Sequence, residues 1–384
     1  MTRRFASPAL VALAALTLLA APAAGVAGSE TPTAPAAGGT VRAQLDTVGF
    51  AVSWHDMLAV TAAALAAEGL PPLAAAGVVA HPDTAATWTA AIMPHDDYVY
   101  AGRTAVHLLP GLRARHWVVF GVCHACRRIG WRDRLILDDF DRWRVAGREF
   151  PVNTALRAEL LAGLGPASAV VDRERQVREH SVEALLPWLY LAVPDADFVP
   201  ILVPGMALAR MDSLANRLAE LLADVCRRRG WEPGRDLGLL ISADAVHYGC
   251  EQWGGRGYDP FGCDACGHAA AVVQDRTLAR ATLCGPLTPA GPASFARLVW
   301  DDAHPDYPYR ITWCGLYSIP FGLLTAAHLQ RTLALPPLAG RLLRYGDSVT
   351  DGRLPAPGTR LGVTAPNTLR HWVGYAAVGY RPAG

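Results

Sequence analysis

The sequence of 384 residues contains no lysine, so all of its 35 basic residues are arginines. Without lysine there is no amine for a Schiff base, no lysine linkage to pyridoxal phosphate and no phosphate-binding lysine of a P-loop. Charge is also scarce, since charged residues make up 18% of the chain and the formal net charge is +1. This balance gives no reason to expect a nucleic-acid partner.

Apolar residues are abundant, and at 52% of the chain they predict a globular protein with a large core. The apolar run at residues 9–21 is too short to span a bilayer comfortably. It follows Arg3 and Arg4 and precedes small residues at 21–23 and 26–28, which is typical of a secretory signal peptide. We expect export to the periplasm or the outside of a bacterium, with no stable membrane anchor after cleavage. An uncleaved anchor is the alternative.

The rest of the chain divides by composition. Residues 1–28 are the expected signal peptide and a Pro/Ala/Gly-rich stretch predicts a flexible linker over 29–50. An α/β domain is expected over 51–345, with a C-terminal extension over 346–384 packed on it. Strands alternate with helices, which predicts a single three-layer domain with a mainly parallel central sheet and helices on both faces. The predicted strands are 88–93, 117–122, 198–203, 239–241, 311–315 and 373–380, and the main predicted helices are 56–68, 211–228, 267–283 and 319–329.

Residues that bind metals follow several of these strands, namely His95, His124, Asp244 with His247, and Cys314. The carboxyl ends of parallel strands meet at one edge of a sheet, where the loops between them carry chemistry. Two histidines and one anionic ligand suit Fe(II), Cu or Zn. Asp244, three residues before His247, is placed to orient that imidazole as a base or a ligand. Taken singly, each residue has a structural alternative, such as a helix cap, a packed polar group or half of a disulfide.

Five short motifs follow one another along the chain in a particular order. They are Pro94-His95-x-x-Tyr98-x-Tyr100-x-Gly102, Gly121-x-x-His124, Glu179-His180-Ser181-x-Glu183-x-x-Leu186-Pro187, Ser242-x-Asp244-x-x-His247-Tyr248-Gly249 and Cys314-Gly315. Over about residues 90–330 this order resembles the Memo family, which includes the bacterial AmmeMemoRadiSam system protein B. The fold of that family resembles the class III extradiol (LigB-type) dioxygenases.

The resemblance implies a role for each matching residue. His95 and His124 match the two metal-binding histidines, and Cys314 matches a cysteine that stands where the dioxygenases use a carboxylate. His247 matches the catalytic histidine and Asp244 the acidic residue beside it. For His180 and Glu183 we expect a structural role, because a charged pair that opens a helix often caps or braces it.

The chain departs from the family pattern at two places. Asp96 and Asp97 replace the usual Ala-Gly after the first histidine, and they add possible ligands. The second histidine lies inside Cys123-His124-Ala125-Cys126 rather than in a Gly-Pro-x-His form. In an exported protein the close cysteines predict disulfides, including one that closes the 250–266 loop, and a structural zinc site is the alternative.

The sequence therefore predicts an exported metalloprotein, with iron or copper favoured and zinc as the alternative, that acts as an oxidase or dioxygenase on a small molecule or peptide. A metal-dependent hydrolase is the second possibility, because Pro94-His95-Asp96-Asp97 faintly resembles the His-Pro-Asp-Asp motif of zinc deacetylases. A non-catalytic protein that binds metal or peptide in the same cleft is the third.

Signal cleavage gives the first testable prediction. We expect the mature protein to begin between Ala24 and Glu30, because both small-residue sites lie near this range. N-terminal sequencing of secreted material checks it, and a secreted chain that still begins at Met1 would contradict it.

Overall fold

The computed structural model describes residues 39–74, 77–80, 87–253, 256–301 and 308–383. The predicted signal peptide and residues 29–38 of the predicted linker lie outside these ranges. Within them, no helix is both long and apolar enough to cross a membrane.

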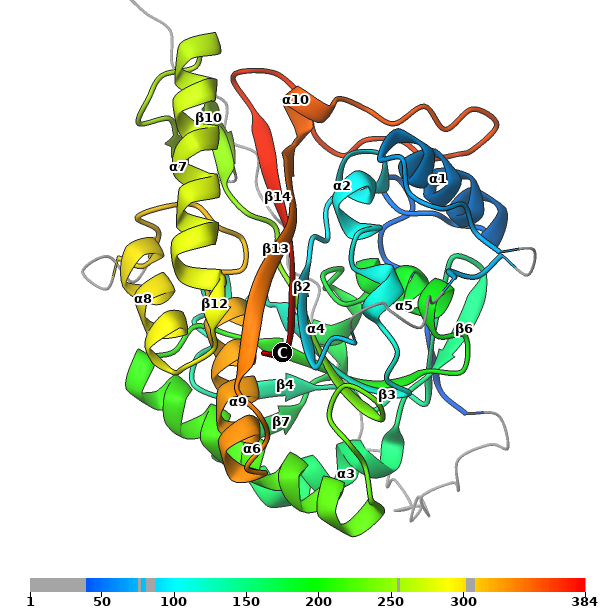
Figure 1. Ribbon diagram of the computed structural model, residues 1–384, viewed down its shortest axis with the longest axis vertical. Helices are drawn as coiled ribbons and strands as arrows, with labels where there is room; N and C mark the ends of the chain where they lie inside the picture. Colours follow the sequence, from blue (N-terminus) through cyan, green and yellow to red (C-terminus); the bar gives the residue numbers. More distant parts are fainter. Residues whose placement is uncertain (1–38, 75–76, 81–86, 254–255, 302–307, 384) are drawn as a thin grey trace, which may run out of the picture. The chain divides into compact units, whose positions relative to one another are not determined.

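The centre of the fold is four parallel strands in the order β2–β9–β3–β8. They are β2 (Ala90–Met93), β9 (Leu237–Ser242), β3 (His116–Val122) and β8 (Asp197–Val203). Figure 1 shows these strands between two groups of helices. The predicted strands at 88–93, 117–122, 198–203 and 239–241 correspond to these four, and the α/β fold class is confirmed.

Antiparallel pairings extend this centre on both sides. Strand β14 pairs antiparallel with β2, and β4 pairs antiparallel with β8, so the eleven-stranded sheet of the described residues is parallel at its centre and mixed at its edges. The remaining strands of this sheet are β4 (Leu135–Leu137), β7 (Ala169–Val171), β10 (His247–Trp253), β11 (Arg256–Tyr258), β12 (Gly285–Pro286), β13 (Leu338–Asp347) and β14 (Trp372–Pro382). A separate small sheet contains β1 (Val41–Arg42), β5 (Arg142–Val145) and β6 (Arg148–Pro151).

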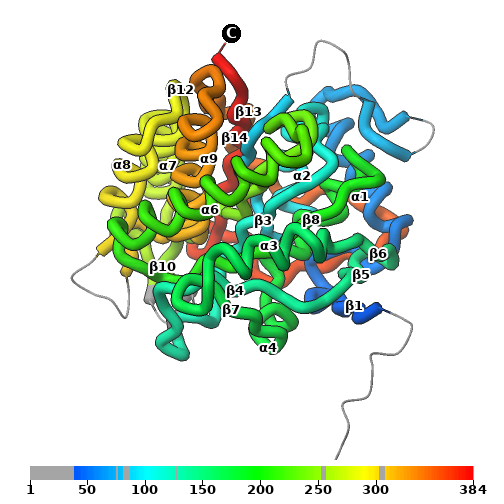
Figure 2. Tube along the Cα trace, turned by 90° about the horizontal axis from the view of Figure 1, so that it is seen from below, coloured from blue at the N-terminus to red at the C-terminus, as the bar shows by residue number. Residues whose placement is uncertain are grey.

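Helices cover both faces of the main sheet, as Figure 2 shows from below. One face carries α3 (Thr154–Leu164), α6 (Leu208–Arg229), α7 (Ala265–Leu283), α8 (Ala290–Val299) and α9 (Ser318–Thr332). The other carries α1 (Trp54–Ala67), α2 (Tyr98–Ala105) and α5 (Leu186–Ala192). Short helices complete the chain at α4 (Arg173–Val177), α10 (Ser348–Asp351), η1 (Leu109–Gly111), η2 (Arg127–Ile129) and η3 (Glu183–Leu185).

The alternation of side chains along β2 explains why helices must pack on both faces of the main sheet. Ala90 and Ile92 belong to the apolar cluster under α6 and α9, whereas Ala91 and Met93 belong to the cluster under α1 and α2. All four side chains are fully buried. Successive residues of a strand point to opposite faces, so a strand that is apolar throughout must lie inside a three-layer structure.

Three segments differ from the sequence-based expectations. Residues 311–315 do not form a strand, and Trp313 makes only an isolated bridge with Val246. Strand β14, from the expected C-terminal extension, is hydrogen-bonded between β2 and β10 inside the sheet. Within the expected linker, β1 pairs with β5, and the side chain of Arg42 is fully buried. Linker-like composition did not reveal the buried ion pair that holds this segment.

That ion pair joins the N-terminal segment to η3, which directly precedes α5. The Arg42 guanidinium bonds to the Glu183 carboxylate, and both side chains have no exposure. The carboxylate also accepts from the backbone N–H groups of Leu45 and Asp46, at 2.9 and 2.8 Å. Glu183 therefore has the structural role that the sequence predicts for it.

We expect Arg42→Met to lower the free energy of unfolding by about 3–5 kcal/mol, because it leaves a buried carboxylate without its counter-ion. The matched control is Arg173→Met, which removes a pair with Asp139 whose side chains are 45% and 47% exposed. Its cost should be at most ~1 kcal/mol. Urea unfolding measures both, and equal losses would show that the buried pair is no more important than the exposed one.

Candidate metal centre

A cavity of about 570 Å³ lies at the carboxyl ends of β2, β3 and β9. Its lining includes all five residues that the sequence singles out for chemistry, namely His95, His124, Asp244, His247 and Cys314. Four of them follow β2, β3 or β9, whereas Cys314 lies in the turn before α9. The parallel centre of the sheet thus brings together residues that are far apart in sequence.

His95 is held from one side by Ser242. The Ser242 hydroxyl donates its single proton to the Ser181 carbonyl, so it accepts from Nδ1 of His95 at 2.9 Å. In the neutral ring the proton therefore lies on Nδ1, and the lone pair of Nε2 faces Cys314. The backbone N–H of His95 donates to Oδ1 of Asp244 at 2.8 Å, which fixes the loop that carries the ring.

His124 is held in the same way by Glu179. One carboxylate oxygen lies 2.8 Å from Nδ1 of His124, and the other accepts from the backbone N–H of the same residue at 2.8 Å. Burial opposes ionisation of Glu179, but His124 and its hydrogen bonds outweigh burial and hold the pKa well below its usual value. A charged Glu179 leaves Nε2 of His124 directed at Cys314. Its place directly before His180 in the third motif is the only sequence signal for this role.

Both rings converge on the sulfur of Cys314. Sγ lies 3.1 Å from Nε2 of His124 and 3.4 Å from Nε2 of His95. Ligands bound at ~2.0 and ~2.3 Å to one tetrahedral ion are separated by about 3.5 Å. Burial opposes ionisation of the Cys314 thiol, but the rings of His124 and His95 outweigh it and hold the pKa well below its usual value. The distance from the sulfur to each ring fits a shared metal ion, and the groups of described residues at this site whose ligand atoms all lie within 4.8 Å of one another are His95, Asp244 and Cys314, and His95, His124 and His180.

Two glycines allow the loops to approach this closely. A Cβ on Gly121 in β3 would lie 2.6 Å from a methyl group of Val182, two residues after His180. A Cβ on Gly315 would lie 2.4 Å from the Cβ of Ala243, at the end of β9. Any larger residue would push the loops that carry His180 and Cys314 away from the strand ends.

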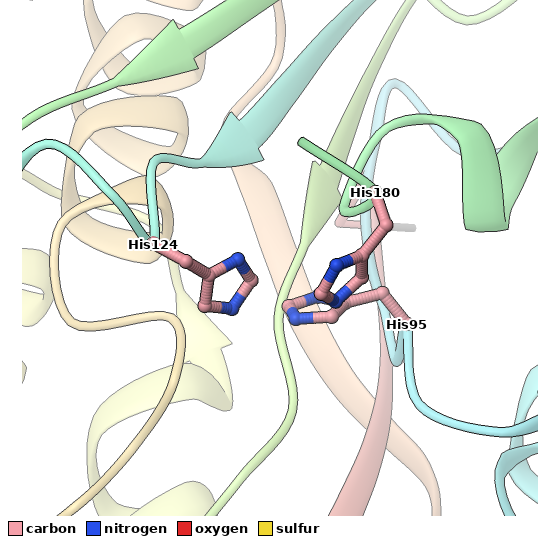
Figure 3. Close-up of side chains that lie close together, drawn as sticks. All are labelled: His95, His124 and His180. Carbon is pink, nitrogen blue, oxygen red and sulfur yellow. The ribbon is translucent and has the colours of Figure 1, made fainter. Parts of the chain in front are cut away.

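His180, for which the sequence predicts a structural role, lies in the cavity. Figure 3 shows its ring beside those of His95 and His124. It stacks on His124 with ring centroids 4.8 Å apart, and one nitrogen from each of the three rings lies within 4.8 Å of the others. Burial lowers the pKa of His180 to about 4, with the nearby His124 adding to the effect. A neutral ring keeps a lone pair, so His180 is an additional candidate ligand.

Asp244 lies between His95 and His247. Its Oδ2 is 3.4 Å from Nε2 of His95 and 3.8 Å from Nε2 of His247. Burial lowers the pKa of His247, but Asp244 and Cys314 outweigh it and raise the pKa to about 10. The backbone of His247 is fixed by its N–H, which donates to the Thr312 carbonyl at 2.9 Å. The carboxylate thus contacts the His95 loop more closely than the His247 ring that the sequence predicts it to orient.

Asp96 and Asp97 have different environments. Asp96 lines the cavity, and its Oδ2 accepts from the Tyr375 hydroxyl at 2.6 Å. Asp97 accepts from the backbone N–H and the hydroxyl of Thr364, at 2.6 and 2.9 Å. Among the described residues, neither carboxylate belongs to a group of three or more metal-ligand atoms.

The cysteines follow the sequence expectation only in part. Cys123 and Cys126 form the expected disulfide. The disulfide expected in the 250–266 loop is wrong, because Cys250, Cys263 and Cys266 are free thiols. The backbone N–H of Cys250 instead donates to Sγ of Cys263 at 2.8 Å, so the two side chains are close but unbonded.

A mixed sheet with a parallel centre and a histidine–cysteine cluster at its carboxyl edge define a three-layer α/β protein with a candidate metal centre. Residues 75–265 match the family described as Memo-like protein. The resemblance to the Memo family found in the sequence is confirmed over these residues. The matched residues include His95, His124, Asp244 and His247, whereas Cys314 lies beyond them.

Curated relatives support this similarity. A MEMO1 family protein of Methanosarcina barkeri is 29% identical over 160 residues, which cover 41% of this chain and 54% of the relative. A MEMO1 family protein of Methanosarcina mazei is 28% identical with the same coverage. The chain therefore spans about half the length of the curated relatives it matches. A solved uncharacterized protein from Escherichia coli K12 is 14% identical with a TM-score of 0.36, covering 75% of this chain and 98% of that one.

The candidate ligand atoms can be compared with the ligand preferences of the metals that the sequence predicts, namely iron, copper and zinc. Two imidazole nitrogens and one low-pKa thiolate are borderline to soft ligands, which suit Fe, Cu and Zn and disfavour Mg or Ca. Each histidine has its other nitrogen held by a polar partner, Ser242 for His95 and Glu179 for His124. Such partners are the usual companions of metal-binding histidines. The residues present therefore fit a transition metal.

The geometry of Glu179 yields the third prediction. We expect Glu179→Gln to lower metal affinity by about 10–100-fold, because an amide no longer fixes the tautomer and orientation of His124. Asp197→Asn is the matched control, since Asp197 holds Nδ1 of His116 at 2.9 Å outside the cavity lining. Titration against a competing chelator measures both, and an unchanged affinity in Glu179→Gln would remove His124 from the ligand set.

Proposed function

We propose that this protein is an exported metal-dependent oxidase that binds iron or copper through His95, His124 and Cys314. The observation that carries the proposal is the convergence of two imidazole Nε2 atoms on one cysteine sulfur, at 3.4 and 3.1 Å, in the wall of a cavity of about 570 Å³. The substrate class is a small molecule or peptide segment that fits this cavity.

The ligand set supports redox chemistry over a structural site. Structural zinc sites usually have four protein ligands, whereas three ligands facing a cavity leave a position for other molecules. A bound iron or copper ion would supply electron transfer to O₂ at that position. His180 beside His124 offers a third nitrogen as a fourth ligand, and whether it binds would decide how open the site is.

His247 and Asp244 support the proton transfers that any reduction of O₂ requires. Nε2 of His247 faces the carboxylate of Asp244 at 3.8 Å, and both side chains line the cavity. The raised pKa of His247 means that the ring holds a proton at neutral pH in the metal-free site. A ring that carries this proton can donate it during the reduction of O₂ and can then act as a base.

The test of the proposal is metal content measured together with O₂ consumption. Protein loaded with Fe(II) or Cu and freed of unbound metal should hold one ion per cavity and consume O₂ with ascorbate as the electron donor. Cys314→Ala should lose both the metal and the O₂ uptake. Full metal without O₂ uptake would favour a binding protein, and release of acetate from N-acetyl amides by the same protein would favour the hydrolase.

The fourth prediction separates proton transfer from metal binding. We expect His247→Ala to keep its metal while O₂ consumption falls by roughly 10²–10⁴-fold, the usual value of an acid–base group. His268→Ala is the control, since His268 also faces a carboxylate, Asp347 at 3.0 Å, but does not line the cavity. Loss of metal in His247→Ala would make His247 a ligand, and unchanged turnover would exclude it from the reaction.

A further inference from the structure

The disulfide between Cys123 and Cys126 opens into the same cavity as the candidate metal centre. Both cysteines belong to the cavity lining, and His124, a proposed ligand, lies between them in sequence. The disulfide was expected from the sequence only as a structural bond. Its position gives it access to any substrate that reaches the metal.

The two sulfur atoms are not equally accessible. Cys126 is 1% exposed, whereas Cys123 is half-buried at the cavity wall. The backbone N–H of Trp131 donates to the Cys126 carbonyl at 2.9 Å, which holds the buried end of the loop in place. An attacking thiol can therefore reach Cys123, while Cys126 is protected as the leaving group.

Charge at the cavity also favours an anionic sulfur nucleophile. Arg128 and Arg132 line the cavity and are exposed to solvent. Thiol–disulfide exchange proceeds through the thiolate, and nearby cationic groups stabilise that form. Carboxylates also line the cavity, but Asp96 and Asp244 are both hydrogen-bonded to protein groups.

We propose that Cys123–Cys126 is a thiol–disulfide exchange site that makes thiols and dithiols the substrates of this cavity. A substrate thiolate forms a bond to Sγ of Cys123, and the Cys123–Cys126 bond breaks with Cys126 leaving as a thiolate that takes up a proton. A second substrate thiol attacks the mixed disulfide, which releases the oxidised substrate and leaves Cys123 as a thiol. The substrate loses two electrons and two protons, and the disulfide gains them.

Reoxidation of Cys123 and Cys126 to the disulfide rests on the oxidase function proposed above. The two cysteine thiols lose two electrons and two protons to O₂, which is reduced to H₂O₂. The exchange half of the cycle needs no O₂, so the two halves can be measured separately.

The exchange half is tested on the metal-loaded protein without air. Dithiothreitol should yield about one equivalent of its oxidised form per chain, with two new thiols that alkylation and peptide mass mapping place at Cys123 and Cys126. In Cys126→Ser, glutathione disulfide should form a mixed disulfide at Cys123 in preference to the six cysteines that are free in the structure. No new thiols at these positions, or a label spread evenly over the other cysteines, would overturn the exchange site.

The complete cycle is tested in air by following dithiothreitol oxidation and H₂O₂ formation. We expect Cys123→Ser and Cys126→Ser to lose catalytic turnover, and Cys263→Ser, which removes a half-buried thiol outside the cavity lining, to keep it. Metal content is measured in each variant. Turnover at the wild-type rate in Cys123→Ser with full metal would show that the disulfide only braces His124, and the proposal would fail. Anaerobic exchange without aerobic turnover would keep the exchange site and overturn the oxidase function.

Discussion

The four central strands end almost level with one another, because Met93 of β2 pairs with Ser242 of β9 and Val122 of β3 pairs with Val203 of β8. A parallel sheet in this register has one edge at which all carboxyl ends meet. The loops that leave this edge carry His95, His124 and Asp244. A shift of one residue in any pairing would turn each side chain of that strand to the opposite face and separate the ring nitrogens from the sulfur.

Backbone N–H groups in loops at such an edge have few carbonyl groups to donate to. In this protein buried carboxylates accept hydrogen bonds from them instead. Glu179 accepts from the backbone N–H groups of His124, His180 and Ser181, at 2.8, 2.9 and 3.1 Å. Asp244 does the same for the His95 loop. Removing a carboxylate from water is costly unless its oxygens find donors, and these backbone groups would themselves be unsatisfied without it. Each carboxylate therefore stabilises a loop and contacts a ring at once: Oε1 of Glu179 does both, whereas Asp244 uses Oδ1 for the His95 loop and Oδ2 for the rings.

Much of this arrangement could be predicted from the sequence, because strand ends are visible as apolar runs followed by polar residues. That pattern predicts His95, His124, Asp244 and His247 at one edge of the sheet. Cys314 was predicted at the end of a strand over 311–315 as well as by the family resemblance, but the structure has no strand there, so the strand-end pattern indicated this residue for the wrong reason. The position of His180 in the cavity was not predicted because its segment precedes a helix, and this position depends on the close packing of Ser181 and Val182 against β3. Long-range contacts of this kind leave no local pattern in one sequence.

The two aspartates that follow His95 show how a departure from a family pattern can serve the fold. Asp97 bonds to Thr364, and Asp96 bonds to Tyr375 of β14, so both carboxylates join the His95 loop to the C-terminal region. Strand β14 pairs directly with β2, the strand that leads into this loop. The C-terminal region therefore supports the first histidine both through the sheet and through its side chains. Burial, followed by the charge of Asp244, raises the pKa of Asp96 to about 6. Because one oxygen of Asp96 is already bonded to Tyr375, this residue contributes its charge to the electric field of the cavity beside the candidate metal ligands.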